Sequence, residues 1–211
     1  FSDALFTAEE IRSSEWLRLI PLFEKGYPQP ESDWSKNPLN YKDHCPKCGV
    51  FEQVASFKIR QEPNLEKQSF MILYWTCALF CTPEVFTGLA DHGIEGYEQW
   101  DVILHKADVP SQRVSQLFVP HVAAPGLVLQ PGELEEAICP VCGVVKYVPH
   151  KKGVMHFKRD ALVPGVDIMQ THEWFGSGGM AYREILVSNR VASLILDKKW
   201  QGVRLKVVEL V

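Results

Sequence analysis

The sequence contains no long apolar run. Nowhere in its 211 residues is there a stretch close to the roughly 18 consecutive apolar residues that a membrane-spanning helix requires. The longest candidate, residues 70–80, is short and contains Tyr74, Trp75 and Thr76. With 46% hydrophobic and 23% charged residues, the composition is typical of a globular chain with a sizeable core, and we expect no membrane segment.

Basic residues are also scarce. Twenty-six Asp and Glu residues outnumber 22 Lys and Arg, which gives a formal net charge of −4. The nearest approach to a basic cluster consists of Lys151, Lys152, Lys158 and Arg159. Proteins that bind nucleic acids usually carry a larger basic patch. The charge balance therefore disfavours a nucleic-acid partner and suits a partner that is itself basic.

No catalytic signature is recognisable. Most of the histidines are scattered, without HxxxH or HExxH spacing: His92, His105, His121, His150, His156 and His172. Residues 176–179 (GSGG) lack the GxxxxGK[ST] spacing of a phosphate-binding loop and predict a flexible hairpin tip. His172 and Glu173 have no nucleophile nearby in the sequence, which favours a surface loop over an acid–base site. We therefore expect that the protein is not an enzyme.

Two copies of one short motif are the most informative feature of the chain. Cys45 and Cys48 belong to CPKCG, and Cys139 and Cys142 belong to CPVCG. Two cysteines on a tight turn can direct both sulfurs to one point, and two such turns supply the four thiolates of a tetrahedral zinc site. Because four thiolates close the coordination sphere, the predicted Zn²⁺ is structural.

Other interpretations of the cysteines are less favoured. CPxC dithiols also occur in thioredoxin-like proteins, but that fold needs the motif once, at the start of a helix. His44 precedes Cys45 and is expected to flank the metal site or to support it by a hydrogen bond. Cys77 and Cys81 lie in the most apolar part of the sequence and are expected to be core cysteines. Cysteines that bind a metal and form no disulfides favour the cytoplasm.

Local patterns predict an α+β fold. A capping box formed by Thr7 and Glu10 begins a helix whose apolar spacing continues to about residue 23, unless Pro21 ends it. Further helices are expected from Pro83 to Gly93 and, after Ser188, over 190–199. Strands are expected at 54–60, 70–77, 97–104, 144–148, 155–159 and 203–211, with extended pieces at 161–169 and 180–187.

The motifs divide the chain into four segments. Residues 1–44 form an N-terminal helix and an ordered loop, 45–108 the first CPxCG half, 109–131 a linker with four prolines, and 132–211 the second CPxCG half. We expect all four to pack as one compact domain.

The two halves resemble each other in sequence. A shift of 106 residues aligns four identical pairs, namely Val85, Asp91, Gly96 and Val102 with Val191, Asp197, Gly202 and Val208. The CxxC motifs are 94 residues apart, so the second half carries an insertion, expected near 176–179. A pseudo-symmetric duplication would bring one motif from each half to the centre, as a shared four-cysteine site requires.

The motifs also carry a family resemblance. Together with residues 158–168 (KRDALVPGVDI), the two CPxCG motifs resemble the double-CxxCG motif family, best known from the Sit-type immunity proteins of myxobacteria. Residues 185–205 are similar to the closing helix and strand of that family. The resemblance implies a protein that binds and neutralises a cognate toxin, with the four cysteines matching the paired motifs. Residues 70–100 do not match, so the resemblance assigns no toxin-contact residue.

Candidate partner contacts come from aromatic and acidic side chains. Trp34, Trp100 and Trp174 lie in or beside expected loops, and Trp is enriched in interface hot spots. Two groups of acidic residues would suit a basic toxin, although short charge runs are usually solvated: Glu133, Glu135 and Glu136, and Glu9, Glu10 and Glu15. The alternative function is a zinc-ribbon protein that is associated with nucleic acid or acts as a regulatory binding protein.

Overall fold

A computed structural model describes residues 5–31, 40–151 and 153–211, and this part of the chain is mostly β-structure with few helices. The α-helices are α1 (Ala8–Ser13), α2 (Pro83–Asp91) and α3 (Asn189–Asp197), with a 3-10 turn at Arg159–Ala161. The strands of the first half of the chain are β1 (Trp16–Pro21), β2 (Pro28–Gln29), β3 (Tyr41–Lys42), β4 (Glu52–Gln53), β5 (Lys58–Ile59), β6 (Phe70–Ile72), β7 (Leu79–Cys81) and β8 (Glu98–Leu104). The remaining strands are β9 (Val109–Phe118), β10 (Leu127–Val128), β11 (Glu136–Ile138), β12 (Val145–Tyr147), β13 (Met155–Phe157), β14 (Ile168–Gln170), β15 (Trp174–Phe175), β16 (Ile185–Ser188) and β17 (Val203–Leu210).

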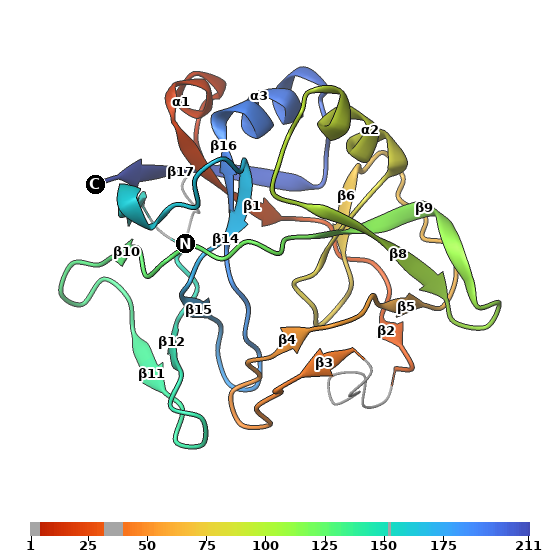
Figure 1. Cartoon of the computed structure of the whole chain (residues 1–211), viewed down its shortest axis with the longest axis horizontal. Coiled ribbons are helices and arrows are strands. Elements are labelled where there is room, and N and C mark those ends of the chain that lie inside the picture. The colour runs from red at the N-terminus through yellow and green to blue at the C-terminus, as the bar shows by residue number, and fades with distance from the viewer. Residues whose placement is uncertain (1–4, 32–39, 152) are drawn as a thin grey trace.

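Two six-stranded sheets form the body of the protein. The β17 sheet has the order β10-β13-β17-β1-β16-β14, and the β8 sheet has the order β2-β5-β8-β9-β7-β6. The hairpin β3–β4 and the three-stranded sheet β11-β12-β15 extend from them. In Figure 1 the helices lie together at the top of the molecule, whereas these smaller elements lie at the bottom.

The two large sheets repeat each other strand for strand. All neighbouring strands are antiparallel except one pair in each sheet, β13–β17 and β5–β8, which occupies the same place in both orders. Helix α2 follows β7 and helix α3 follows β16, and each of these strands is the second from the same end of its sheet. Both helices span nine residues, and their first residues are 106 apart (189 − 83). The sequence repeat at this separation therefore has a counterpart in the structure.

When the halves are taken as residues 1–108 and 109–211, the first strand of each half lies in the sheet of the other half. β1 is paired with β16 and β17, which come from the far end of the chain, whereas β9 is paired with β7 and β8. The pairing registers of β1 and β9 agree. Leu19 is paired with Ile185 and Leu205, and Leu117 is paired with Leu79 and Gln99, which lie 106 residues earlier in the chain (185 − 79 and 205 − 99). Each sheet is therefore completed by a strand that belongs to the other half.

The N-terminal helix is much shorter than the sequence predicts. The capping box at Thr7 and Glu10 is present, but α1 ends at Ser13 and residues 16–21 form β1. Alternating and helical spacings both fit the short apolar run Trp16–Pro21, and backbone pairing on both edges of β1 decides between them. Pro21, expected to end a helix, is instead the last residue of a strand.

The predicted linker is also partly wrong. Residues 109–118 form β9, the longest strand of the described chain, in the interior of the β8 sheet. The strand spacings agree with part of the predicted insertion: β6 and β14 are 98 residues apart (168 − 70), whereas β7 and β16 are 106 apart (185 − 79). This change accounts for eight of the twelve residues (106 − 94) that the sequence predicts. The eight additional residues lie in the segment that contains 176–179. Helices α2 and α3 lie where the sequence predicts them, although neither Thr82 nor Ser188 caps with its side chain.

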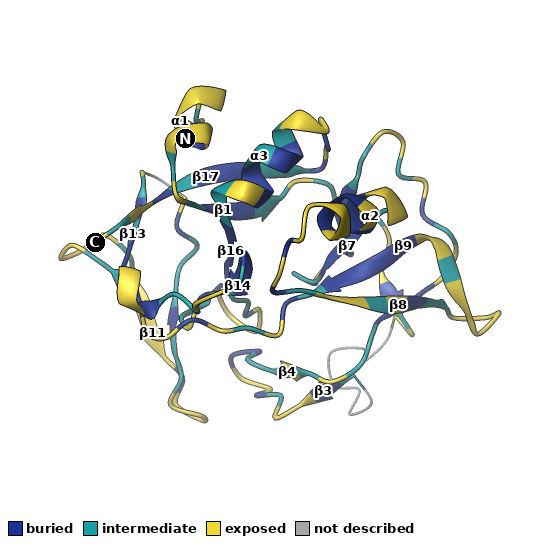
Figure 2. Ribbon diagram, turned by 45° about the horizontal axis from the view of Figure 1, so that its top comes forward, coloured by how far each residue is buried: buried dark blue, intermediate teal, exposed yellow. Residues whose placement is uncertain are grey.

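The apolar core consists of three main clusters, shown as dark blue segments in Figure 2. The largest contains side chains from both sheets and from α2 and α3, so the two halves share it. The second includes Ile59 and Phe80 of the β8 sheet, and the third includes Phe157 and Leu186 of the β17 sheet. Because the largest cluster contains side chains of both halves, we expect the halves to fold together.

Two glycines fix the contact between the halves. The Gln201 carbonyl accepts hydrogen bonds from the amides of Ser69 (2.9 Å) and Phe70 (3.0 Å), and Gly202 follows it at φ 102°. A Cβ at Gly202 would overlap the carbonyl oxygen of Phe70. The corresponding Gly96, at φ 104°, makes the same close approach to Ile168.

Gly202→Ala is expected to destabilise the protein by about 3 kcal/mol, because it combines an unfavourable φ with a steric overlap. Gly165→Ala is the matched control: its φ is 79° and a Cβ there would have nothing within 4 Å. That control should cost only about 1 kcal/mol. Urea unfolding of both variants measures the difference, and equal losses would contradict a steric role for Gly202.

A buried ion pair holds the exchanged strand β1. The Arg18 guanidinium donates to the Glu184 carboxylate (2.6 Å), and both side chains are almost fully buried. Arg18 also lies 3.3 Å from Nδ1 of His150, whose Nε2 lies 3.1 Å from Glu133. Burial lowers the pKa of His150, which favours the neutral ring that accepts from Arg18.

The first half has uncharged residues at the equivalent places: Gln116 of β9, and Ala78, which directly precedes β7. Arg18→Gln alone should cost about 3 kcal/mol, because it leaves Glu184 buried without its cation. Adding Glu184→Ala gives the same residue types as those equivalent places and should recover most of that loss. Urea unfolding of the two single variants and the double variant gives the coupling free energy between the two residues. If the losses of the single variants simply add up in the double variant, this interpretation is contradicted.

Candidate metal centre

Both CPxCG motifs form the same turn. In the first, the amide of Cys45 donates to the Val50 carbonyl (2.8 Å) and the amide of Gly49 to the Cys45 carbonyl (2.9 Å). The second motif repeats both bonds at residues 139–144, at 3.0 and 2.9 Å. Gly49 and Gly143 take φ values of 79° and 74°, which glycine adopts without strain. The first turn joins β3 to β4, and the second joins β11 to β12.

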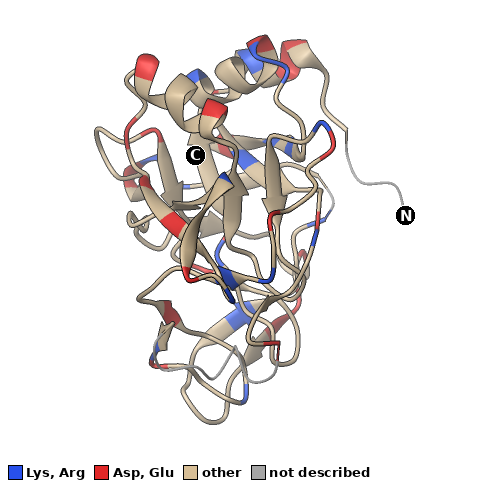
Figure 3. Ribbon diagram, turned by 90° about the vertical axis from the view of Figure 1, so that its right-hand side faces the viewer, with Lys and Arg blue, Asp and Glu red and all other residues tan. Residues whose placement is uncertain are grey.

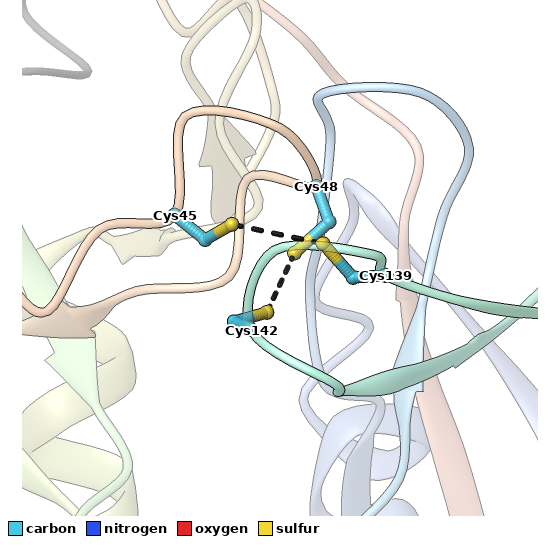
Figure 4. A group of neighbouring side chains, drawn as sticks. All are labelled: Cys45, Cys48, Cys139 and Cys142. Atoms are coloured by element: carbon cyan, nitrogen blue, oxygen red, sulfur yellow. Dashed lines mark hydrogen bonds between the residues drawn. The ribbon is translucent and has the colours of Figure 1, made fainter.

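The tertiary structure brings the four cysteines together. Their sulfurs all lie within 4.8 Å of one another, and Figure 4 shows the side chains from the two loops converging. The Sγ atoms of Cys45 and Cys139 are 3.8 Å apart, and those of Cys48 and Cys142 are 3.5 Å apart. Sulfurs about 2.3 Å from a tetrahedral zinc lie about 3.8 Å from each other. Since all four thiols are free of disulfides, the donor set fits zinc.

The local environment lowers the pKa of two of these thiols and raises the pKa of a third. Backbone amides of Cys142 and Val141 lower the pKa of Cys139 to about 6, and those of Cys48 and Lys47 lower the pKa of Cys45. Burial raises the pKa of Cys48 to about 12. Ionisation of the Cys48 thiol at neutral pH would therefore be favoured by a cation among the sulfurs, as zinc would supply.

A buried lysine supports the first turn. The Lys146 ammonium donates to the carbonyls of Cys48 (2.7 Å), Gly178 (2.8 Å) and Met180 (2.8 Å). Its charge would also offset the net negative charge of four thiolates around a divalent ion. Gly49 lies so close to the Gly179 carbonyl that a side chain would overlap it. Residues 176–179, predicted to be a flexible hairpin tip, are therefore packed against the metal turn.

The other cysteines and His44 lie outside the four-sulfur group among the described residues. Cys81 is fully buried, as predicted for a core cysteine. Cys77 is only half-buried and lines a cavity of about 930 Å³, where desolvation raises its pKa to about 12. His44 lines the same cavity.

The predicted partner contacts have different surroundings. Trp34 lies outside the described residues. Trp100 is half-buried, stacked on Phe118 with ring centroids 3.8 Å apart. Trp174 is half-buried in the large cavity, with the Arg183 guanidinium 4.5 Å from its ring centroid. The structure does not bring Trp100 and Trp174 together in one cluster of contacting rings.

Sequence reasoning missed an exposed aromatic cluster. Tyr27 packs against Tyr74 and Trp75, with centroid distances of 4.9 and 4.7 Å. Trp75 is 60% exposed and has a φ of 65°, which is unusual for a bulky residue. Tyr27 is distant in sequence from the other two rings, so no local pattern indicated the cluster.

The His172–Glu173 pair and the charge distribution give no sign of a second site. Glu173 accepts hydrogen bonds from the amides of Gly126 (2.8 Å) and Leu127 (3.0 Å), which is a structural role. In the view of Figure 3, basic and acidic residues are interspersed along the described chain. Among the described residues, no helix has the length and apolar character needed to cross a membrane.

Comparisons with known proteins do not assign this chain to a family. No protein-family model matches it, and no curated protein matches it. The four-cysteine cluster itself is consistent with the paired CxxC motifs on which the family resemblance depends.

Cys48→Ser is expected to abolish stoichiometric zinc binding and to lower the free energy of unfolding by more than about 3 kcal/mol, because metal binding couples to folding. Cys77→Ser, which changes a thiol outside the cluster, should retain one equivalent of zinc. Elemental analysis and urea unfolding test both variants. A Cys48→Ser protein with full zinc content and stability would refute the site.

Proposed function

We propose that this protein is an immunity protein that binds a cognate bacterial toxin and neutralises it by stoichiometric inhibition. The observation that carries the proposal is the convergence of Cys45, Cys48, Cys139 and Cys142 from two distant turns. This paired-motif arrangement is the feature shared with the double-CxxCG family, whose members are best known as immunity proteins.

The metal in this proposal is a structural Zn²⁺. Four thiolates leave no open coordination position for a substrate or a water molecule, so the site would stabilise the fold and perform no catalysis. It would connect the β3–β4 turn to the β11–β12 turn across 94 residues of sequence (139 − 45). Inhibition by binding needs such a fixed surface, because preorganisation reduces the entropic cost of association.

We also infer that the two halves are related by duplication. The support is the shared strand order, the common place of the parallel pair and the agreement of registers around β1 and β9. In this interpretation each half contributes one zinc turn and one exchanged strand. The cytoplasm is the proposed location, because free thiols and a thiolate metal site suit a reducing compartment.

Binding of a nucleic acid is the competing function, since many zinc ribbons bind nucleic acids. The net charge of −4 and the interspersed charges in Figure 3 count against it. A complex with DNA or RNA whose affinity falls steeply with salt would favour this alternative.

Co-expression with the product of the neighbouring gene tests the proposal. We expect a stoichiometric complex with that product, one equivalent of zinc in the purified complex, and protection of cells from the toxicity of the partner. Zinc without any protein partner would leave the metal site standing and contradict the immunity function. A dithiol that cycles between oxidised and reduced forms, without zinc, would contradict both.

A further inference from the structure

Among the described residues, no strand pairs with the outer edge of β11, which lies beside the second metal turn. Strand β11 is the last strand of the sheet β11-β12-β15, and all three of its residues are exposed. On the β12 side, the Glu135 carbonyl accepts from Val148 and the Cys139 amide donates to Val144, both at 3.0 Å. In an antiparallel pair the bonds alternate, so the amides and carbonyls of Glu136 and Ile138 point to the outer edge.

Two exposed apolar side chains lie next to this edge. Ile138 is 66% exposed and Val141 is 67% exposed. The first metal turn makes the same backbone hydrogen bonds with His44 and Lys47 at the corresponding positions. The turn and its sulfur geometry therefore do not require apolar residues at these two places, and their exposure needs another explanation.

The surroundings of the edge indicate what would bind there. A cavity of about 500 Å³ is lined by residues of β11, of β12 and of 176–179, and Glu135, Glu136, Ile138 and Pro140 are among its lining residues. The cavity is also lined by Lys47 and the buried Lys146, whose ammonium already has three carbonyl partners. The exposed carboxylates of Glu135 and Glu136 therefore favour a basic segment with apolar residues.

We propose that β11 binds an extended, basic segment of the toxin by strand addition. The backbone of Glu136 and Ile138 would pair with the segment, its apolar side chains would cover Ile138 and Val141, and its Lys or Arg side chains would face Glu135 and Glu136. This inference rests on the proposed function, which supplies the toxin. A second copy of the chain is disfavoured as the occupant, because it would bring two sets of these glutamates together.

The test uses the double variant Ile138→His/Val141→Lys, which copies the residues of the first metal turn. Val109→Lys is the matched control, since Val109 is an exposed apolar residue (47%) of another sheet. The probe is a blocked seven-residue peptide, Lys-Lys-Val-Val-Lys-Lys-Val, which places both lysine and valine on each face of an extended strand. Its binding to the zinc-loaded protein is followed by NMR. We expect the peptide to protect the amides of Glu136 and Ile138 from hydrogen exchange, and the double variant to bind at least about tenfold more weakly.

A glutamate–valine peptide of the same length should bind more weakly than the lysine–valine peptide. Equal binding of the lysine–valine peptide by the wild-type protein and the double variant would overturn the proposal. So would amide shifts confined to other strands. Shifts at β11 that grow with protein concentration in the absence of peptide would identify a second copy as the occupant and would also overturn it.

Protection of toxin-expressing cells separates this inference from the proposed function. If the wild-type protein and Val109→Lys protect cells but the zinc-loaded double variant does not, both the function and the surface are supported. If the double variant protects as well as the wild type, the surface is refuted and the function stands. If the wild type gives no protection, the function is refuted, the toxin cannot be the occupant, and the proposal falls even when the peptide binds at β11.

Discussion

The pairing of β1 with β16 and β17 is the interaction on which the rest of the fold depends. It places a strand from the start of the chain inside a sheet built from the end, and it positions Arg18 for its ion pair with Glu184. The equivalent place of β9 makes the dependence mutual. Each sheet needs a strand from the other half to be complete. The largest apolar cluster, which includes α2 and α3, likewise needs side chains from both halves.

The four-cysteine cluster connects the halves a second time, at the bottom of the molecule in Figure 1 and away from the helices. A zinc ion there would act on loops that have little apolar core of their own, which is where a metal contributes most. Lys146 and the close packing of Gly49 on residues 176–179 show that these loops are fitted to each other by the protein itself.

Comparison of the halves separates what the fold requires from what one half has in addition. Both contain a glycine at the inter-half contact and the same cysteine turn. Among the described residues, the buried ion pair of Arg18 occurs only in the β17 sheet, where it joins the two halves. The exposed apolar residues Ile138 and Val141 and the longer segment around residues 176–179 occur only in the second half. Because the shared fold does not require these features, they are the first places to examine for a specific function.

The grouping of the four cysteines, the capping box at Thr7, and helices α2 and α3 could be predicted from the sequence. Each depends on spacing or on residues close together in the chain, which local geometry constrains. Local patterns could not predict that residues 16–21 form a strand, that β9 occupies the expected linker, or that Tyr27 joins Tyr74 and Trp75. The physical reason is that a short apolar run is compatible with several conformations, and long-range backbone pairing selects one of them.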